Sequence, residues 1–490
     1  MADRPLRPPR VELAPGLEIP RILTGLWQVA DMERDGRRVD LDRAAAALGE
    51  YADAGFDVFD MADHYGSAED IAGRFLAIAG RGRARAFTKW CPAPGPMTPD
   101  VVRDGVGRSF ARLGLGRIDL MQFHWWQYRH PGYIDAMTEL AKMRADGRIG
   151  ELGVTNFDTD HLRLLVKHGI PVISNQVSFS LLDRRAAGRM TELCRESGVR
   201  LLAYGTLGGG FLTDRWVGKE EPTTIPDWSK SKYKRFIDAV GGWNVLQGIL
   251  TAAKAVAAKH RVSVANVAVR WVLAQEAVAA VIIGARLGES EHRSDNLAPF
   301  SFALDAEDRA RLAEALAKAR HVPGDCGDEY RRPPFLTATG DLSHHLERLP
   351  RVYEARPLAG RCARTWVDSG SKWEALAGYS RAVRAGNRIL VSGTTATHGA
   401  GTVVCPGDVE GQTVYALDKI AACIEALGGE LDDVVRTRIY VQSAALWEPV
   451  ARVHARYFGA VRPANTLVEI GALVADCEVE IEAEAEVGAA

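Results

Sequence analysis

The stretch "FDVFDMADHYGSAEDIAG", residues 56–73, joins an apolar run to an acid, a phenol and the start of a helix. The run before Asp60 predicts a strand, and the letters around Tyr65 and Gly66 predict a turn that leads into a helix. One interpretation is that the end of the strand presents a carboxylate and a phenol to a cleft. The other is an ordinary strand-to-helix connection, because these residue types are common at such ends.

The same pattern extends over the first three hundred residues, where short apolar runs alternate with amphipathic segments. This alternation is typical of βαβ units and a parallel sheet. Eight such runs predict an α/β fold, a (β/α)8 TIM barrel, over residues 15–320. The predicted strands cover residues 22–27, 58–62, 84–90, 118–125, 149–156, 172–177, 199–205 and 278–285.

Polar side chains stand at the ends of these predicted strands. Because the carboxyl ends of barrel strands and the loops after them form the active face of such folds, we expect these side chains to share one cleft. They are Asp60, Tyr65, Lys89, His124, Thr155, Asn156, Asn175, Gln176 and Tyr204.

Four of these residues suit proton transfer to a carbonyl oxygen as hydride reaches its carbon. The phenol of Tyr65 has an ordinary pKa near ~10, and a neighbouring ammonium from Lys89 would lower that pKa. Asp60 would hold the lysine charged, and His124 would hydrogen-bond a substrate oxygen. Taken singly, each residue also has a purely structural explanation.

These segments resemble the aldo-keto reductase family. "FDMADHYG", "FTKW" and "IDLMQFHWW" are similar to the family's aspartate–tyrosine, lysine and histidine segments, and "GVTNF" and "NQV" follow in the family's order. The resemblance implies that Tyr65 is the general acid/base, that Asp60 and Lys89 tune it, and that His124 orients the carbonyl. The function it implies is NAD(P)H-dependent reduction of an aldehyde or ketone, or oxidation of the alcohol.

The resemblance also implies where the cofactor binds. No GxGxxG motif follows the first strand, as expected for a barrel that holds its dinucleotide at the strand ends. NADPH is favoured over NADH because Arg286 and Arg293 would pair with a 2′-phosphate. The implied cofactor-binding residues are Trp27, Asp60, Thr155, Asn156, Gln176, Tyr204, Gly205, Thr206, Leu207, Gly208, Gly284, Arg286, His292, Asp295 and Asn296.

The substrate pocket is predicted from aromatic residues near strand ends, namely Trp27, Trp90 and Trp125, with Trp126 as a further candidate. We expect one or two of these tryptophans to be ordinary barrel packing instead. An insertion at residues 214–243 is a candidate lid. Its basic letters "KSKYKR" fit an acidic substrate or the cofactor phosphates, but a solvated helix face is the favoured interpretation.

Composition limits the remaining possibilities. A net charge of −2 argues against a nucleic-acid partner, and no apolar run reaches the roughly 18 residues of a membrane span. Seven scattered cysteines without a CxxC pair favour neither a metal site nor a disulfide framework, so we expect no metal. The charged, proline-rich beginning does not resemble a secretory signal, and we expect a cytoplasmic protein.

The pattern changes after residue 320. Residues 321–371 are rich in Pro, Gly, Arg and His and predict a linker or wrapping arm, and residues 372–490 predict an α+β domain of order ββαβαββ. "AGYSRAVRAGNRILVSGTT" and "RPANTLVEIGAL" resemble the RidA/YjgF imine-deaminase superfamily, which implies a chorismate-mutase-like fold and a homotrimer. The family's site positions fall on Tyr379, Asn465, Thr466 and Glu480.

Asn465 stands where active deaminases carry the arginine that binds a substrate carboxylate. An amide cannot replace a bidentate guanidinium, so we expect this domain to be noncatalytic or atypical. Two alternatives to a carbonyl reductase remain open. One is an imine reductase or imine-handling bifunctional enzyme, and the other is an NADPH-sensing assembly protein without turnover.

Overall fold

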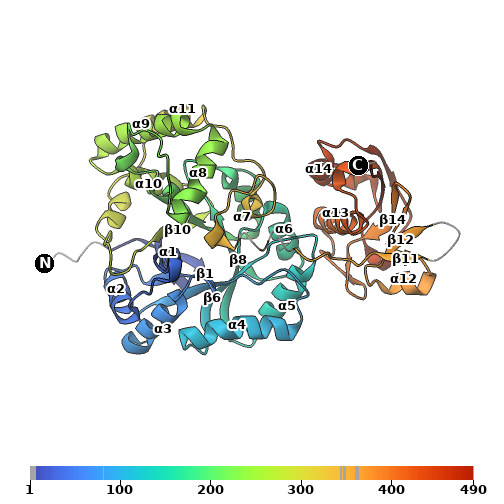
Figure 1. The fold of residues 1–490 in the computed structure, drawn as a ribbon, viewed down its shortest axis with the longest axis horizontal. Helices are drawn as coiled ribbons and strands as arrows, with labels where there is room; N and C mark the ends of the chain where they lie inside the picture. Colours follow the sequence, from blue (N-terminus) through green and yellow to red (C-terminus); the bar gives the residue numbers. More distant parts are fainter. Residues whose placement is uncertain (1–6, 81, 343–344, 346–348, 359–362, 489–490) are drawn as a thin grey trace.

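The computed structural model describes residues 7–80, 82–342, 345, 349–358 and 363–488, and it consists of a barrel followed by a second, smaller domain (Figure 1). Eight parallel strands close the barrel in the order β10-β3-β4-β5-β6-β7-β8-β9, which confirms the predicted TIM barrel. The strands are β3 (Ile22–Gly25), β4 (Val58–Asp60), β5 (Arg85–Trp90), β6 (Ile118–His124), β7 (Ile149–Thr155), β8 (Val172–Ser178), β9 (Arg200–Tyr204) and β10 (Val278–Gly284). A hairpin that the sequence did not predict, β1 (Arg10–Ala14) and β2 (Leu17–Pro20), precedes them.

Helices surround the barrel. Several begin at a capping side chain, as at Thr98, whose hydroxyl accepts a hydrogen bond from the N–H of Val101. The helices of this part are α1 (Trp27–Met32), α2 (Leu41–Asp53), α3 (Ala68–Ala79), α4 (Pro99–Leu113), α5 (Gly132–Ala145), α6 (Thr159–Lys167), α7 (Arg189–Ser197), α8 (Trp228–Val240), α9 (Trp243–His260), α10 (Val264–Leu273) and α11 (Ala306–Leu316).

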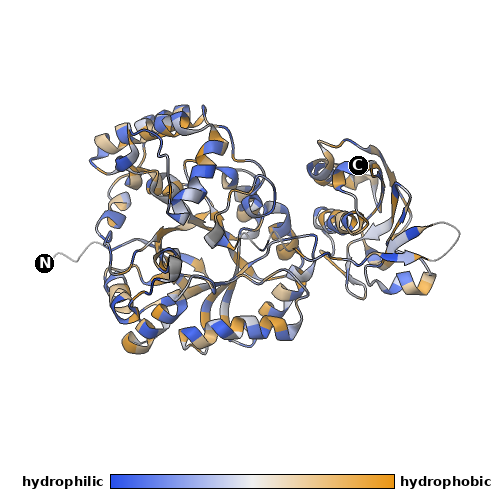
Figure 2. Cartoon of the chain, viewed as in Figure 1, coloured by the Kyte–Doolittle hydropathy of each residue, from blue (hydrophilic) through white to orange (hydrophobic). Residues whose placement is uncertain are grey.

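The barrel strands are largely hydrophobic, whereas the helices around them carry both hydrophobic and hydrophilic residues (Figure 2). Successive side chains of a strand point to opposite faces. In β5, Lys89 therefore points into the barrel toward Asp60, while Trp90 points outward and packs against Gly105 of α4. This alternation decides which predicted site residues reach the cleft.

The second domain is a seven-stranded sheet in the order β11-β12-β13-β14-β19-β17-β18, and the predicted α+β order is confirmed. Its strands are β11 (Arg356–Leu358), β12 (Arg364–Val367), β13 (Ala382–Ala385), β14 (Arg388–Thr395), β17 (Val434–Val441), β18 (Ala464–Glu469) and β19 (Val479–Glu486), and its long helices are α13 (Val409–Ala426) and α14 (Trp447–Phe458). In β19 buried apolar residues alternate with more exposed glutamates.

Strands β11 and β12 fall within residues 321–371, where the sequence predicted only a linker or arm. β12 pairs with β13 and so belongs to the second sheet. The two strands are three and four residues long, too short for an alternating pattern to stand out in the sequence.

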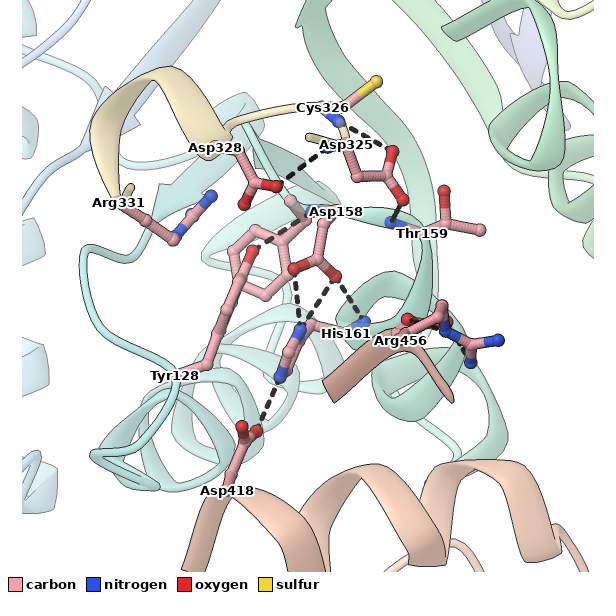
Figure 3. Close-up of polar contacts among 12 residues, drawn as sticks. Tyr128, Asp158, Thr159, His161, Asp325, Cys326, Asp328, Arg331, Asp418 and Arg456 are labelled. Atoms are coloured by element: carbon pink, nitrogen blue, oxygen red, sulfur yellow. Dashed lines mark hydrogen bonds and ion pairs between the residues drawn. The ribbon is translucent and has the colours of Figure 1, made fainter. Parts of the chain in front are cut away.

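The two domains contact each other through α6 of the barrel and α13 of the second domain. Buried His161 lies between Asp158 of the barrel and Asp418 of α13, with an N–O distance of 2.7 Å to each (Figure 3). Arg456 of α14 pairs with Asp160 at 2.7 Å. The second domain is therefore joined to the barrel by buried, hydrogen-bonded charges.

None of the helices in the described parts of the chain is long and apolar enough to cross a membrane.

Candidate active site

A buried ion pair lies at the centre of the predicted site. Lys89 Nζ lies 2.7 Å from Asp60 Oδ2 and 2.8 Å from the carbonyl oxygen of Met61. The other carboxylate oxygen of Asp60 accepts hydrogen bonds from the side-chain amides of Gln122, at 3.1 Å, and Gln176, at 2.7 Å. The ion pair therefore has hydrogen-bond partners on both sides, which a buried pair needs to be stable.

Tyr65 lies in the loop after β4, with Lys89 Nζ 4.9 Å from the centre of its ring. Burial raises the pKa of the Tyr65 phenol well above its usual value, and the charge of Asp60 raises it further. The predicted net lowering of this pKa is therefore wrong, because burial and the charge of Asp60 outweigh the ammonium of Lys89. Tyr65 is a neutral phenol that can donate a proton.

His124 ends β6 and is buried. Burial lowers its pKa well below the usual range, and the positive charge of Arg331 lowers it further, so the imidazole is neutral. Its Nε2 atom has no hydrogen-bond partner among the described residues. Buried polar atoms are rarely left without a partner, so this atom fits a ligand oxygen.

One cleft of about 420 Å³ connects the predicted residues. Besides Tyr65 and Lys89, the predicted residues that line it are Trp27, Asp60, Thr155, Asn156, Gln176, Tyr204, Gly205, Thr206, Leu207, Gly284, Arg286, His292, Asp295 and Asn296. The strand ends therefore bring together residues from across the barrel, as the sequence predicted from the position of active sites in such folds.

Seven predicted residues of the barrel do not line the cleft, namely Gly208, His124, Asn175, Trp90, Trp125, Trp126 and Arg293. The predicted placement of Trp90 and Trp125 in the substrate pocket is therefore corrected. Both side chains are buried in the barrel wall, Trp90 against Gly105 and Trp125 with its indole N–H donating to the carbonyl oxygen of Gln127. Asn175 is buried and donates to the carbonyl oxygen of Phe157 at 2.9 Å. His124 is overlaid by Trp126 and Tyr330, whose rings lie 4.3 and 5.1 Å from its own.

The cleft has features that fit a nicotinamide cofactor. Thr155 Oγ1 is buried and has no partner among the described residues, and Asn156, at a φ of 58°, accepts a hydrogen bond from the hydroxyl of Tyr204. A carboxamide would satisfy such groups. Arg286 lines the cleft and donates to Asp31 and Asp227, while Arg293 lies outside the cleft and pairs with Glu291.

Helix α8 lines the cleft and contacts two other parts of its wall. Ser229 accepts a hydrogen bond from the indole N–H of Trp27 at 2.9 Å, and Tyr233 lies so close to Gly205 that a Cβ there would be 2.2 Å from its hydroxyl oxygen. Lys232, one of the "KSKYKR" residues, is buried and lines the cleft, so the prediction of a solvated face is wrong for it. The apolar residues of this segment recur every three or four positions, and this spacing could have indicated that one face of the helix is buried.

Tyr330 and Asp341 also line the cleft, although the chain reaches them after the barrel is complete. Arg331 holds this segment in place by donating to the carbonyl oxygens of Asn156, at 2.7 Å, and Trp125, at 2.5 Å. No sequence pattern within residues 321–371 indicated this contact, because the contact depends on how the segment packs against the barrel.

Among the described residues, Asp63, His64 and Cys91 place possible metal ligands within 4.8 Å of one another. Asp63 is already engaged, because it lies 3.1 Å from His64 Nδ1 and accepts the backbone N–H of Cys91. Burial raises the pKa of the Cys91 thiol well above its usual value, which keeps the proton on sulfur. We therefore assign no metal site to these three residues.

Two of the four predicted residues of the second domain, Tyr379 and Glu480, lie near the guanidinium of Arg381. The hydroxyl of Tyr379 accepts from Arg381, and Asn465 donates to Thr437 Oγ1 at 2.9 Å on the helix side of the sheet. Glu480 of β19 pairs with Tyr440, and Thr466 of β18 pairs with Arg438, so these two residues lie on the strands that flank β17.

Comparisons with known proteins agree with this geometry. Residues 21–317 match the model of the "Aldo/keto reductase family", and residues 370–487 match "Endoribonuclease L-PSP". Residues 21–317 are more than half of the 490-residue chain. The chain therefore belongs to the aldo-keto reductase family, with a RidA/YjgF domain fused behind the barrel, and both resemblances are confirmed.

Individual relatives give the same result. The structure of a glycerol dehydrogenase from Gluconobacter oxydans is 25% identical and covers 66% of this chain and 98% of its own, with a TM-score of 0.52. An NADH-specific methylglyoxal reductase from Escherichia coli is 26% identical over 45% of this chain and 67% of its own length. A RutC family protein from Pyrococcus horikoshii is 35% identical over 21% of this chain and 83% of its own length. The barrel is thus that of an NAD(P)H-dependent oxidoreductase.

Proposed function

We propose that the protein reduces an aldehyde or ketone, with Tyr65 as the proton donor. The observation that carries this proposal is the neutral, half-buried phenol of Tyr65 beside the Lys89–Asp60 pair. With it goes the buried Nε2 atom of His124, which has no hydrogen-bond partner among the described residues. When bound, the reduced nicotinamide supplies hydride to the carbonyl carbon.

The residues of the chain handle the oxygen and its proton. With its proton on Nε2, neutral His124 donates a hydrogen bond to the carbonyl oxygen and fixes its position. Tyr65 transfers the phenolic proton to that oxygen as the alcohol forms. Lys89, 4.9 Å from the ring centre, stabilises the resulting phenolate until solvent returns a proton. For the carbonyl to reach His124, Tyr330 must move aside or share the space.

The test is consumption of NADPH and NADH with a panel of aldehydes, ketones and cyclic imines, run beside Tyr65→Phe. We expect carbonyl turnover in the wild type, a fall in kcat of at least about a hundredfold in the variant, and unchanged cofactor binding by tryptophan quenching. Turnover of imines alone would favour the imine reductase. Cofactor binding without any turnover would favour the NADPH-sensing protein.

We propose NADPH as the preferred cofactor, because Arg286 is a guanidinium on the wall of the cleft. Asp31 and Asp227 already neutralise this guanidinium, so the preference is expected to be modest. Arg286→Ala is expected to weaken NADPH binding several-fold and to leave NADH binding unchanged. Equal loss for both cofactors would contradict a contact with the 2′-phosphate.

We propose that the second domain is a noncatalytic assembly domain that forms a homotrimer. Leu390 and Val468, on two strands of its sheet, are 44% and 41% exposed, which fits a surface covered by another copy. Light scattering is expected to give about three times the 53.3 kDa chain mass. The purified protein is expected not to hydrolyse an α-imino acid generated by an amino-acid oxidase, since Asn465 supplies no guanidinium.

We further propose a reducing compartment, the cytoplasm, because the six cysteines within the described ranges are free and buried. We also propose that the barrel domain ends near residue 320. Because β11 and β12 belong to the second sheet, we propose that the second domain begins before Arg356 and not at residue 372, which limited proteolysis would test.

A further inference from the structure

Lys232 is a buried ammonium on the wall of the cleft. Its Nζ atom lies 5.1 Å from the ring centre of Tyr204 and 4.8 Å from that of Tyr330, and it donates a hydrogen bond to the Tyr330 hydroxyl at 2.7 Å. A buried charge is stable only when a counter-charge neutralises it.

The counter-charge comes from outside the barrel. Asp341, in the segment after the barrel, places a carboxylate oxygen 3.0 Å from Lys232 Nζ, and its side chain also lines the cleft. Burial alone would lower the pKa of Lys232, but Asp341 and the surrounding tyrosines raise it well above its usual value. A carboxylate of the chain therefore lies inside the cleft, bound to an ammonium.

Lys232 lies at the end of the cleft where the substrate would react. A single aromatic ring, Tyr330, separates its ammonium from the imidazole of His124. Two other cations that line the cleft, Lys230 and Arg286, are paired with Asp227 at a different part of the wall. An anion on Lys232 would therefore belong to a substrate held at His124, and the cofactor phosphates would lie elsewhere.

We propose that Lys232 recognises an anionic group on the substrate, so that the cleft selects aldehydes or ketones that carry a carboxylate. The substrate carboxylate replaces Asp341 as the partner of Lys232. This exchange keeps the buried ammonium neutralised, whereas a neutral substrate that displaced Asp341 would leave it without a counter-charge. The inference rests on the proposed reductase function and adds the substrate class to it.

The kinetic test uses 4-carboxybenzaldehyde and its methyl ester, which differ in charge but present the same aldehyde across one ring. We expect the wild type to prefer the acid by about tenfold or more in kcat/KM, as hydrogen bonds to charged groups allow. Lys232→Met should remove the preference mainly through KM for the acid, and Lys232→Arg should retain most of it. The affinity for NADPH should be the same in all three proteins.

The variant Asp341→Asn distinguishes substrate recognition by Lys232 from a purely structural role of the Lys232–Asp341 pair. If Asp341 competes with the substrate, this variant lowers KM for the acid and leaves the ester unaffected. If the Lys232–Asp341 pair only holds α8 to the segment after the barrel, both substrates lose equally in both variants, which would overturn the proposal. Lys234→Met is the matched control, because Lys234 lies on the same helix, pairs with Glu221 and Asp238, and does not line the cleft.

A binding measurement keeps this test independent of turnover. Calorimetry with NADP⁺ present should show that 4-(hydroxymethyl)benzoate binds the wild type at least about tenfold more tightly than Lys232→Met, whereas 4-methylbenzyl alcohol should not distinguish them. Reduction of both aldehydes without a charge preference would overturn the substrate class and leave the reductase standing. Preferential binding of the acid without any turnover would overturn the reductase and leave the anion site standing.

Discussion

Tyr65 and His124 are both held in their neutral forms, and burial is the largest cause for each. Burial raises the pKa of the phenol well above 10.0 and lowers the pKa of the imidazole well below 6.5. Because Tyr65 keeps its proton, it is suited to donate that proton to an oxygen, as carbonyl reduction requires. At the scale of single residues, the low-dielectric setting therefore decides the protonation states, and the neighbouring ammonium does not.

These two shifts predict a broad pH plateau for reduction. The acid form of Tyr65 is lost only when the pH rises through its raised pKa, and neutral His124 is lost only when the pH falls through its lowered pKa. We therefore expect kcat for carbonyl reduction to stay level between pH 6.5 and pH 10.0, measured at saturating cofactor. A decline of kcat centred between those values would mean that another group limits the reaction.

The Lys89–Asp60 pair is expected to matter for folding as well as for chemistry, because both side chains are almost fully buried. Lys89→Met leaves the carboxylate of Asp60 buried without a cation, so we expect the free energy of unfolding to fall by about 3–5 kcal/mol in urea denaturation. The double variant Asp60→Asn, Lys89→Met should recover much of this loss while remaining inactive. A double variant as unstable as the single one would show that the charge of Asp60 is not the cause.

At the scale of elements, the close approach of α3 and α4 depends on one glycine. A Cβ on Gly73 of α3 would lie 2.3 Å from the carbonyl oxygen of Arg112 and 3.0 Å from backbone atoms of Leu113. Backbone atoms cannot rotate away as a side chain can, so the helices would have to separate.

We therefore expect Gly73→Ala to lower the free energy of unfolding by about 1–3 kcal/mol, from the overpacking of the two helices. Gly107→Ala in α4 is the matched control, because nothing lies within 4 Å of a Cβ at that glycine. The control should stabilise the protein by about 0.5–1 kcal/mol through helix propensity. Urea denaturation of the two variants measures the difference, and equal effects would contradict the packing argument.

At the scale of the whole molecule, His161 ties the two domains together. Burial alone would lower the pKa of His161, but Asp158 and Asp418 raise it to about 10. Burial alone would raise the pKa of Asp158, but the histidine lowers it to about 2. His161 and Asp158, drawn in Figure 3, therefore both stay charged over a wide pH range.

The sign of each shift sets the pH dependence of the interface. The contribution of His161 is complete below its unfolded pKa of 6.5 and is lost as the pH rises through about 10, while that of Asp158 is complete above 3.8 and is lost as the pH falls through about 2. Calorimetry should therefore find the domains unfolding together at pH 5 and separating toward pH 10.

His161→Leu tests this assignment, because it leaves two buried carboxylates facing each other. We expect the two unfolding transitions to separate already at pH 5, at a cost to the interface of about 3–5 kcal/mol. Adding Asp418→Asn to this variant should bring the transitions closer again. If His161→Leu unfolds like the wild type at both pH values, the cluster contributes nothing to domain coupling.

The sequence by itself determined the elements and the order of the chemical groups. The eight apolar runs and the polar residues at their ends, from Asp60 to Tyr204, were readable because strand burial and capping depend on neighbouring letters. The same holds for the second domain, whose predicted order ββαβαββ is that of β13, β14, α13, β17, α14, β18 and β19. The proposed catalytic residues were predicted from their positions at strand ends or in the loop that follows.

Only the tertiary structure decided how these groups are surrounded. The raised pKa of Tyr65 follows from its surroundings in the cleft, and the outward direction of Trp90 follows from the alternation of side chains in β5. Lys232 and Asp341 meet in the cleft although they lie more than a hundred residues apart. Such contacts depend on how distant segments pack together, and the free energy of that packing is not encoded in any local stretch of the chain.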